Sequence, residues 1–205
     1  EIHLDHGRVD RATDFFAAAL SIDPKVAPAR VALGAVAITR GDGAAAEREI
    51  QAALAVRPDV RLAHFNLGVL AESRGDRAGV LDAYRRELDH HADAYRAMFN
   101  AARLLQQGGD SIGARQLLER AVAVNSRFAE GFFYLAQARL AGGDLDGAAR
   151  AARDGLALGA TSATAPLGHF VLADVAMREG RLDEAARELD AGKALEQRTA
   201  RPGTR

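Results

Sequence analysis

The chain has 205 residues, of which 48% are hydrophobic and 27% charged, a composition typical of folded proteins. Its 27 basic and 28 acidic side chains give a net charge of -1, so no overall field favours nucleic acid or an anionic membrane surface. It lacks cysteine, which excludes disulfides and thiolate metal sites, and no apolar run reaches the ~18 to 20 residues of a membrane-spanning helix. We expect a soluble protein that is cytoplasmic or periplasmic.

The chain repeats itself with a period of 34 residues. Its clearest markers are glycines 34 residues apart, with a last interval of 37 that a three-residue insertion near residues 159 to 165 explains: Gly7, Gly41, Gly75, Gly109, Gly143 and Gly180. Four of them precede an aspartate: Asp42, Asp76, Asp110 and Asp144. This pattern predicts two helices in each unit, because the glycine can end the first helix in a left-handed conformation and the aspartate can cap the second.

Small residues stand at fixed distances from these glycines. The residues seven positions before them are Gly34, Gly68, Ala102, Ala136 and Ala173. Twelve positions after them stand Ala19, Ala53, Ala121, Gly155 and Gly192, with Glu87 as the exception. Small side chains at these spacings predict that the two helices of each unit approach closely.

The units follow one another along the chain. Residues 1–24 contain the end of a first helix and a complete second helix, and residues 200–205 are expected to form a flexible tail. Between them the period predicts five helical hairpins, at residues 27–60, 61–94, 95–128, 129–162 and 166–199. Pro24 and Pro58 mark the ends of second helices.

This pattern resembles the tetratricopeptide repeat (TPR) family, whose unit is 34 residues long with small residues, glycine-aspartate, alanine and proline in these places. The resemblance covers residues 1–199. Two features of the family pattern are replaced: the tryptophan of the first helix, by Arg30, His64, Met98, Phe132 and His169, and the closing proline, by Ala92, Ser126 and Ala160. The resemblance implies an all-α fold, a right-handed superhelix of about five full repeats plus an N-terminal half-repeat.

One hairpin cannot be stable alone. Ordering 34 residues costs about 50 kcal/mol, which about 2,000 Å² of apolar burial would offset. Stacked hairpins supply that area by sharing a core. The incomplete repeat at residues 1–24 leads us to expect a fragment of a longer protein or a processed product, and an uncovered face through which copies could self-associate.

The sequence contains no catalytic or cofactor motif. Phosphate-binding glycine loops, H-E-x-x-H and G-x-S-x-G are all absent. His90 and His91 are adjacent, so on a helix they would point apart and make a poor metal site. His64 and His169 occupy positions where the family places a large packing residue. We therefore predict a non-enzymatic protein without metal or cofactor.

In the family, the first helices line the concave side, and positions 2, 5, 9, 12 and 13 of each unit hold ligands. Position 5 is occupied by Val31, Phe65, Phe99, Phe133 and Phe170. These phenylalanines either pack between hairpins or leave one face open as an apolar ladder for a peptide. Both alternatives remain open for the sequence alone.

Polar residues on the same helices are further candidates. Asn66 and Asn100 at position 6 could close local hydrogen bonds or bind a ligand backbone. Arg96 and Arg103 lie seven residues apart beside Gln106 and Gln107, and are either solvated or a seat for one carboxylate. Gln137 stands at position 9 of its unit.

Groove charges restrict the ligand class. The groove positions hold three basic residues and three acidic ones, whose charges cancel: Arg96, Arg103 and Arg178, and Glu72, Glu130 and Asp174. This balance disfavours uniformly charged ligands. Two known types of TPR groove are also disfavoured. The clamp for chaperone tails needs polar or basic groups at positions that Val31, Ala35 and Glu130 occupy here. The asparagine ladder of O-linked sugar transferases is interrupted at Ala32, Tyr134 and Val171.

We therefore expect a protein-interaction scaffold that binds a peptide or helical segment in its concave groove, through Phe65, Asn66, Arg96, Phe99, Asn100, Arg103, Phe133, Gln137 and Phe170. The alternative is an accessory module at the C-terminal end of a larger enzyme. Residues 165–196 bear a loose similarity to the ends of bacterial sulfatase-type hydrolases that carry such arrays.

Overall fold

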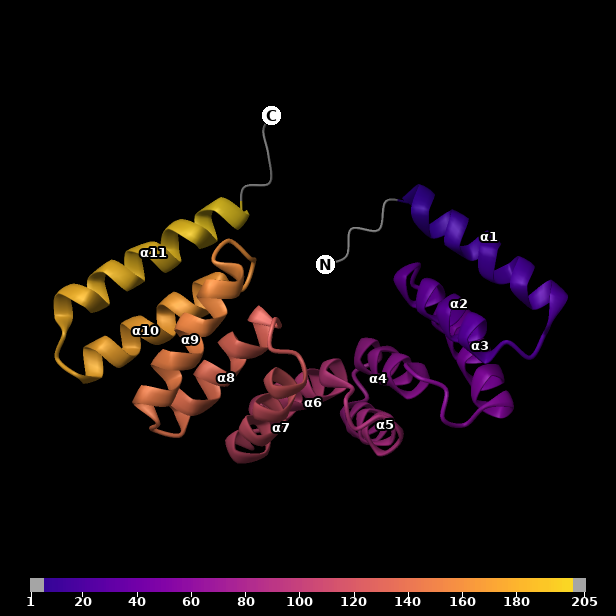
Figure 1. Ribbon diagram of the computed structural model, residues 1–205, viewed down its shortest axis with the longest axis horizontal. Helices are drawn as coiled ribbons and strands as arrows, with labels where there is room; N and C mark the ends of the chain where they lie inside the picture. Colours follow the sequence, from indigo (N-terminus) through magenta and orange to yellow (C-terminus); the bar gives the residue numbers. More distant parts are fainter. Residues whose placement is uncertain (1–5, 201–205) are drawn as a thin grey trace. The chain divides into compact units, whose positions relative to one another are not determined.

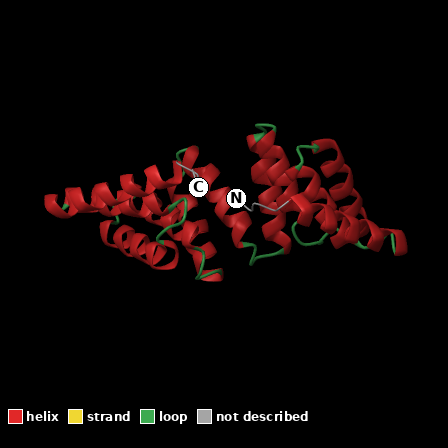
Figure 2. Cartoon of the chain, turned by 90° about the horizontal axis from the view of Figure 1, so that it is seen from above, coloured by secondary structure: helices red, strands yellow, loops and turns green. Residues whose placement is uncertain are grey.

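The structure, a computed structural model, describes residues 6–200, with side chains over residues 10–198. This part of the chain forms α-helices and no strand (Figures 1 and 2). The helices are α1 (His6–Ile22), α2 (Ala27–Thr39), α3 (Gly43–Val56), α4 (Ala63–Ser73), α5 (Arg77–His90), α6 (Tyr95–Gln107), α7 (Ser111–Val124), α8 (Ala129–Ala141), α9 (Leu145–Gly159), α10 (Ala165–Arg178) and α11 (Leu182–Ala200). None of these helices combines the length and apolarity needed to span a bilayer.

The chain divides into two compact units, Glu1–Ala97 and Met98–Arg205, which meet inside α6. In the first unit α1 packs on α2, and the pairs α2–α3 and α4–α5 form hairpins. In the second unit α8–α9 and α10–α11 form hairpins, and α7 contacts α8 (Figure 1). One pair of helices lies within each of the first four predicted ranges, and α10 and α11 extend one residue beyond the two ends of the fifth, 166–199.

Two details at the ends of the array differ from the prediction. Gly7, which we expected to end a helix, lies within α1, because no helix precedes α1 in the described residues and one glycine in a helix costs only about 1 kcal/mol. The predicted end of a first helix falls on residues 1–5, outside the described residues. Ala200, expected in the tail, is the last residue of α11, and the rest of that tail also lies outside the described residues.

The turn between the helices of a hairpin has the predicted chemistry. The backbone φ is positive at Gly41, Gly75, Gly109, Gly143 and Gly180, between 72° and 86°. Each aspartate that follows accepts a hydrogen bond from a backbone amide at the start of the next helix. Asp42 accepts from Ala45 at 2.9 Å, and Asp76, Asp110 and Asp144 accept from the equivalent amides at 2.9 to 3.0 Å. The prediction that glycine ends one helix and aspartate caps the next is therefore confirmed at four turns.

The small residues before the turn allow the two helices to touch. A Cβ added to Gly34 would lie 2.6 Å from Ile50, and one added to Gly68 would lie 2.5 Å from the ring of Tyr84. Both partners belong to the second helix of the same hairpin, and both are fully buried. The close approach predicted from these small residues is confirmed at these two hairpins.

Glu87, the exception to the small-residue pattern, caps a helix. Its carboxylate is buried and accepts hydrogen bonds from the backbone amides of Leu62 at 2.8 Å and Phe65 at 3.1 Å. Leu62, the N-cap of α4, has a left-handed φ of 69° and provides no side-chain cap. A carboxylate from α5 therefore satisfies amides at the start of α4, where it also complements the helix dipole.

Two polar pairs join the helices of a hairpin at equivalent positions. Arg30 forms an ion pair with Glu49 at 3.0 Å, and His169 Nδ1 lies 2.7 Å from a carboxylate oxygen of Glu188. In both cases the partners are 19 residues apart. Arg30 and His169, which stand in the place of the family tryptophan, therefore contact the second helix of their own hairpin, as the packing interpretation of His169 requires.

Candidate functional site

The phenylalanines at position 5 serve mainly as packing residues in the second unit. Phe133 is fully buried, and its ring edge fills the space beside two glycines of neighbouring helices. A Cβ added to Gly155 would lie 2.6 Å from this ring, and one added to Gly168 would lie 2.7 Å from it. Phe133 therefore belongs to the core and has no open face for a ligand, although we expected it among the binding residues.

The other rings differ in exposure. Phe99 is buried and makes edge contacts with Phe128 and Tyr134, each with ring centroids 5.0 Å apart. Phe65, in the first unit, is partly buried beside Tyr84. Phe170 is also partly buried, against Gly192. Of the three position-5 rings in the second unit, Phe99 and Phe133 are buried and Phe170 is partly exposed.

A hollow of about 420 Å³ lies on the first-helix face of the second unit, between α6, α8 and α10. Its lining consists of Gln106, Gln137, Leu140, Ala141, Phe170, Val171, Asp174 and Arg178. All of these except Val171 stand at position 5, 9, 12 or 13 of their repeats. We call this set of residues the α6–α8–α10 groove.

The groove combines an apolar surface with neutral polar groups. Leu140 and Phe170 provide the partly exposed apolar part, and Gln106 and Gln137 provide carboxamides. The Arg178 guanidinium donates two hydrogen bonds to Asp174, at 2.9 and 3.1 Å, so these two charges largely neutralise each other. Such a lining can hold an apolar side chain and hydrogen-bond the backbone of an extended peptide.

The other predicted site residues lie outside this groove. Arg96 is exposed, and its Nε donates to the Tyr95 hydroxyl at 3.2 Å. Asn100 and Arg103, on the same helix, each already have an interaction partner. Asn66 is buried in α4 of the first unit. The structure thus brings together two of the nine predicted residues, Gln137 and Phe170.

Six groove residues were absent from our set of predicted binding residues: Gln106, Leu140, Ala141, Val171, Asp174 and Arg178. For all of them except Val171, the signal that could have found them was the position rule itself, applied at positions 9, 12 and 13 rather than mainly at the phenylalanines. Asp174 and Arg178 had been considered only as groove charges.

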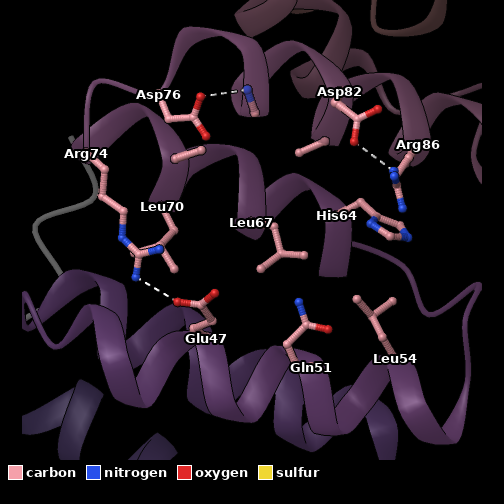
Figure 3. Close-up of a pocket in the computed structure, with 13 residues that line it drawn as sticks. Glu47, Gln51, Leu54, His64, Leu67, Leu70, Arg74, Asp76, Asp82 and Arg86 are labelled. Atoms are coloured by element: carbon pink, nitrogen blue, oxygen red, sulfur yellow. Dashed lines mark hydrogen bonds and ion pairs between the residues drawn. The ribbon is translucent and has the colours of Figure 1, made fainter.

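A second hollow, of about 310 Å³, lies in the first unit between α3, α4 and α5 (Figure 3). Its apolar lining includes Leu54 of α3 and Leu67 and Leu70 of α4. Two ion pairs border it, Arg74 with Glu47 and Arg86 with Asp82, both at 2.8 Å. We call this hollow the α3–α5 cleft.

His64 lies in the wall of the α3–α5 cleft. Its ring stacks on that of His90, with centroids 5.7 Å apart and planes at 9°. Burial lowers the pKa of His64 below its ordinary value of 6.5, with smaller contributions from neighbouring charges that include an opposing one from Glu87. The neutral imidazole is therefore the favoured form in the folded protein.

Acidification is expected to weaken the fold around His64. The folded state disfavours the protonated imidazole, so the unfolded chain binds that proton more readily. The contribution of the neutral His64 imidazole to the free energy of unfolding is fully present above pH about 6.5. It is lost as the pH falls below this value and through the lowered pKa of the folded state. Hydrogen exchange of the α4 amides, measured between about pH 5 and 8 and corrected for intrinsic exchange rates, should show this loss, and His64→Gln should reduce its slope. Equal slopes for both proteins would contradict the assignment.

The described residues contain no group of three or more histidine, cysteine or acidic side chains that could hold a metal ion.

Comparison with protein families shows what kind of repeat this is. One tetratricopeptide repeat model matches residues 3–65, and a second matches residues 99–163 and 135–197. The chain belongs to the tetratricopeptide repeat family. No curated protein matches it.

Solved structures with the same fold have low sequence identity to this chain. PilF of Pseudomonas aeruginosa is 17% identical, with a TM-score of 0.77, and the match covers 97% of this chain and 91% of PilF. MamA of Desulfovibrio magneticus RS-1 is 17% identical, with a TM-score of 0.69 and coverage of 83% and 95%. YrrB, described as a TPR protein with an unusual peptide-binding site, is 14% identical, with a TM-score of 0.72 and coverage of 89% and 92%. These likenesses show the fold, an all-α TPR solenoid.

Proposed function

We propose that this protein is a non-catalytic protein-interaction scaffold whose α6–α8–α10 groove binds a segment of a partner protein. The observation that carries the proposal is the position of the groove. Three successive repeats contribute to one hollow, and seven of its eight lining residues occupy positions at which TPR proteins hold ligands. Peptide binding by YrrB, stated in the description of its structure, supports this class of function for the fold.

The chemistry of the groove favours a largely uncharged, extended segment with one apolar anchor. Leu140 and Phe170 would contact the anchor, while the carboxamides of Gln106 and Gln137 would hydrogen-bond the peptide backbone. The mutual ion pair of Asp174 and Arg178 leaves little net charge for an acidic or basic ligand. No observation favours the alternative of a module within a sulfatase-type enzyme.

Filling the groove should abolish peptide binding without unfolding the protein. Ala141 lines the groove and is exposed at the end of α8, so Ala141→Arg places a long charged side chain in the hollow at little cost to packing. We expect peptides selected from a displayed library of random 12-residue sequences to bind this variant at least about tenfold more weakly, equivalent to about 1.4 kcal/mol. Fluorescence anisotropy would measure the affinities.

Ala186→Arg is the matched control, because Ala186 is also an exposed alanine, on α11 and outside the groove lining. It should bind the selected peptides like the unmodified chain. Equal binding by all three proteins would exclude the groove as the site, and failure to select any peptide would count against peptide binding altogether.

A further inference from the structure

The outer face of α1 carries an exposed apolar stripe. Phe15 is 71% exposed and Ile22 87% exposed, and the exposed Ala18 lies between them. These residues are spaced as i, i+3 and i+7, so they follow one side of the helix over about 10 Å. We call them the α1 stripe. The stripe leaves two large apolar side chains in water on one side of the helix.

The α3–α5 cleft matches this stripe in length. The ends of each of its three walls are seven residues apart along a helix: Glu47 and Leu54 on α3, His64 and Ala71 on α4, and Gly79 and Arg86 on α5. Seven residues of helix also measure about 10 Å. The cleft can therefore accommodate two side chains that stand two helical turns apart.

The cleft and the stripe also match in polarity. Figure 3 shows the leucines of the cleft between two bordering ion pairs, Glu47 with Arg74 and Asp82 with Arg86. Each pair is internally neutral, and Asp76, the remaining charged residue of the lining, accepts a hydrogen bond from the Gly79 amide. At neutral pH, burial favours the uncharged form of His64. The leucines of the cleft therefore offer an apolar strip between these groups, and the α1 stripe carries no charged side chain.

We infer that the α1 stripe of one copy of this protein docks into the α3–α5 cleft of a second copy, with Phe15 and Ile22 against Leu54 and Leu67. Stripe and cleft are different surfaces, so the contact is heterologous: each copy offers one of each, and association continues from copy to copy unless it closes into a ring. The α1 stripe and the α3–α5 cleft share no residue with the α6–α8–α10 groove, so this contact is independent of peptide binding in that groove.

Two single variants separate the surfaces. Phe15→Glu places a charge on the stripe, and Gln51→Arg places one in the wall of the cleft. Both residues are exposed, so both variants should keep the helical circular dichroism spectrum. Ile112→Glu is the matched control, because Ile112 is an exposed apolar residue of α7, 68% accessible. Ile22→Glu is a second stripe variant.

Sedimentation of the chain between about 10 µM and about 1 mM should show a mass that rises with concentration. Ile112→Glu should behave in the same way, whereas each stripe or cleft variant should raise the dissociation constant at least about tenfold. An equimolar mixture of Phe15→Glu and Gln51→Arg should form a one-to-one dimer and nothing larger, because one variant retains the cleft and the other retains the stripe.

Three results would overturn the inference. A constant monomer mass for the unmodified chain would exclude self-association. Loss of association in Phe15→Glu but not in Gln51→Arg would show that stripes pair with each other or with another surface. Absence of the mixed dimer would show that stripe and cleft are not partners.

Discussion

Replacing Phe133 with alanine is expected to lower the free energy of unfolding of the second unit by about 3 to 5 kcal/mol, the usual cost of removing a fully buried phenylalanine ring. The ring is fully buried and lies against Gly155 of α9 and Gly168 of α10. Because these glycines have no side chain to move into the vacated space, we expect a persistent cavity and a cost toward the upper end of this range.

Urea denaturation followed by circular dichroism would measure this loss, and hydrogen exchange would locate it, because a repeat array can unfold in more than one step. Protection should fall in α8, α9 and α10. Phe170→Ala is the matched control: this ring is only partly buried, so its removal should cost about 1 to 2 kcal/mol. Equal losses for the two variants, or a loss below about 1 kcal/mol for Phe133→Ala, would contradict the core assignment.

Replacing Glu87 with glutamine is expected to destabilise the first unit by about 1 to 3 kcal/mol. The two carboxylate oxygens accept from two different amides, those of Leu62 and Phe65. Glutamine retains one acceptor oxygen for one of the two amides. It presents an NH₂ group to the other amide, and this NH₂ group cannot accept the hydrogen bond that the amide donates. The start of α4 would then contain a buried donor without an acceptor.

Hydrogen exchange at Leu62 and Phe65 gives the local readout, and urea denaturation gives the overall one. Asp89→Asn serves as the control because it makes the equivalent change at an exposed position of the same helix, where we expect less than about 0.5 kcal/mol. If Glu87→Gln exchanged like Asp89→Asn at the two amides, the carboxylate would not be the cap of α4.

The hairpins could be predicted because their signals are local. A glycine such as Gly41 can adopt a positive φ that other residues adopt only with strain, and the adjacent Asp42 lies within reach of the next free amide. Both effects act within a few residues, and the period repeats them along the chain. The close contact of Gly68 with Tyr84 is also set within one hairpin.

The exposure of the phenylalanines could not be predicted in this way. Whether a ring at position 5 is buried depends on the residues that face it from other helices. Phe133 is buried because Gly155 and Gly168 leave room for it, and Gly168 belongs to the next repeat. Phe170 has Gly192 on one side and remains partly exposed. The same position therefore holds a core residue, Phe133, in one repeat and a groove residue, Phe170, in the next.

The role of Glu87 shows the same limit of a local pattern. Its departure from the small-residue rule is visible in the sequence, but its partners are backbone amides 22 and 25 residues earlier. Those amides need an acceptor because Leu62, the N-cap of α4, has no side-chain cap of its own. The residue types alone do not show that these amides lack an acceptor or that Glu87 supplies one.

The sequence could predict which face of the helices carries the candidate groove. It could not predict where on that face the hollow lies. The position rule identifies Gln106, Gln137, Asp174 and Arg178 as neighbours. The hollow forms where small or flexible side chains, such as Ala141, leave space between the helices. The sizes of side chains from three repeats decide this together.

Site-specific photo-crosslinking tests the central claim, that the first-helix face of the second unit binds a protein segment. A benzophenone amino acid would replace Gln137 in the groove or, in a second protein, Gln116, which is exposed on α7 outside the groove. With a fluorescent peptide selected against the unmodified chain, our account predicts a covalent adduct from position 137 and none from position 116. Adducts from position 116 alone, or equally from both positions, would contradict it.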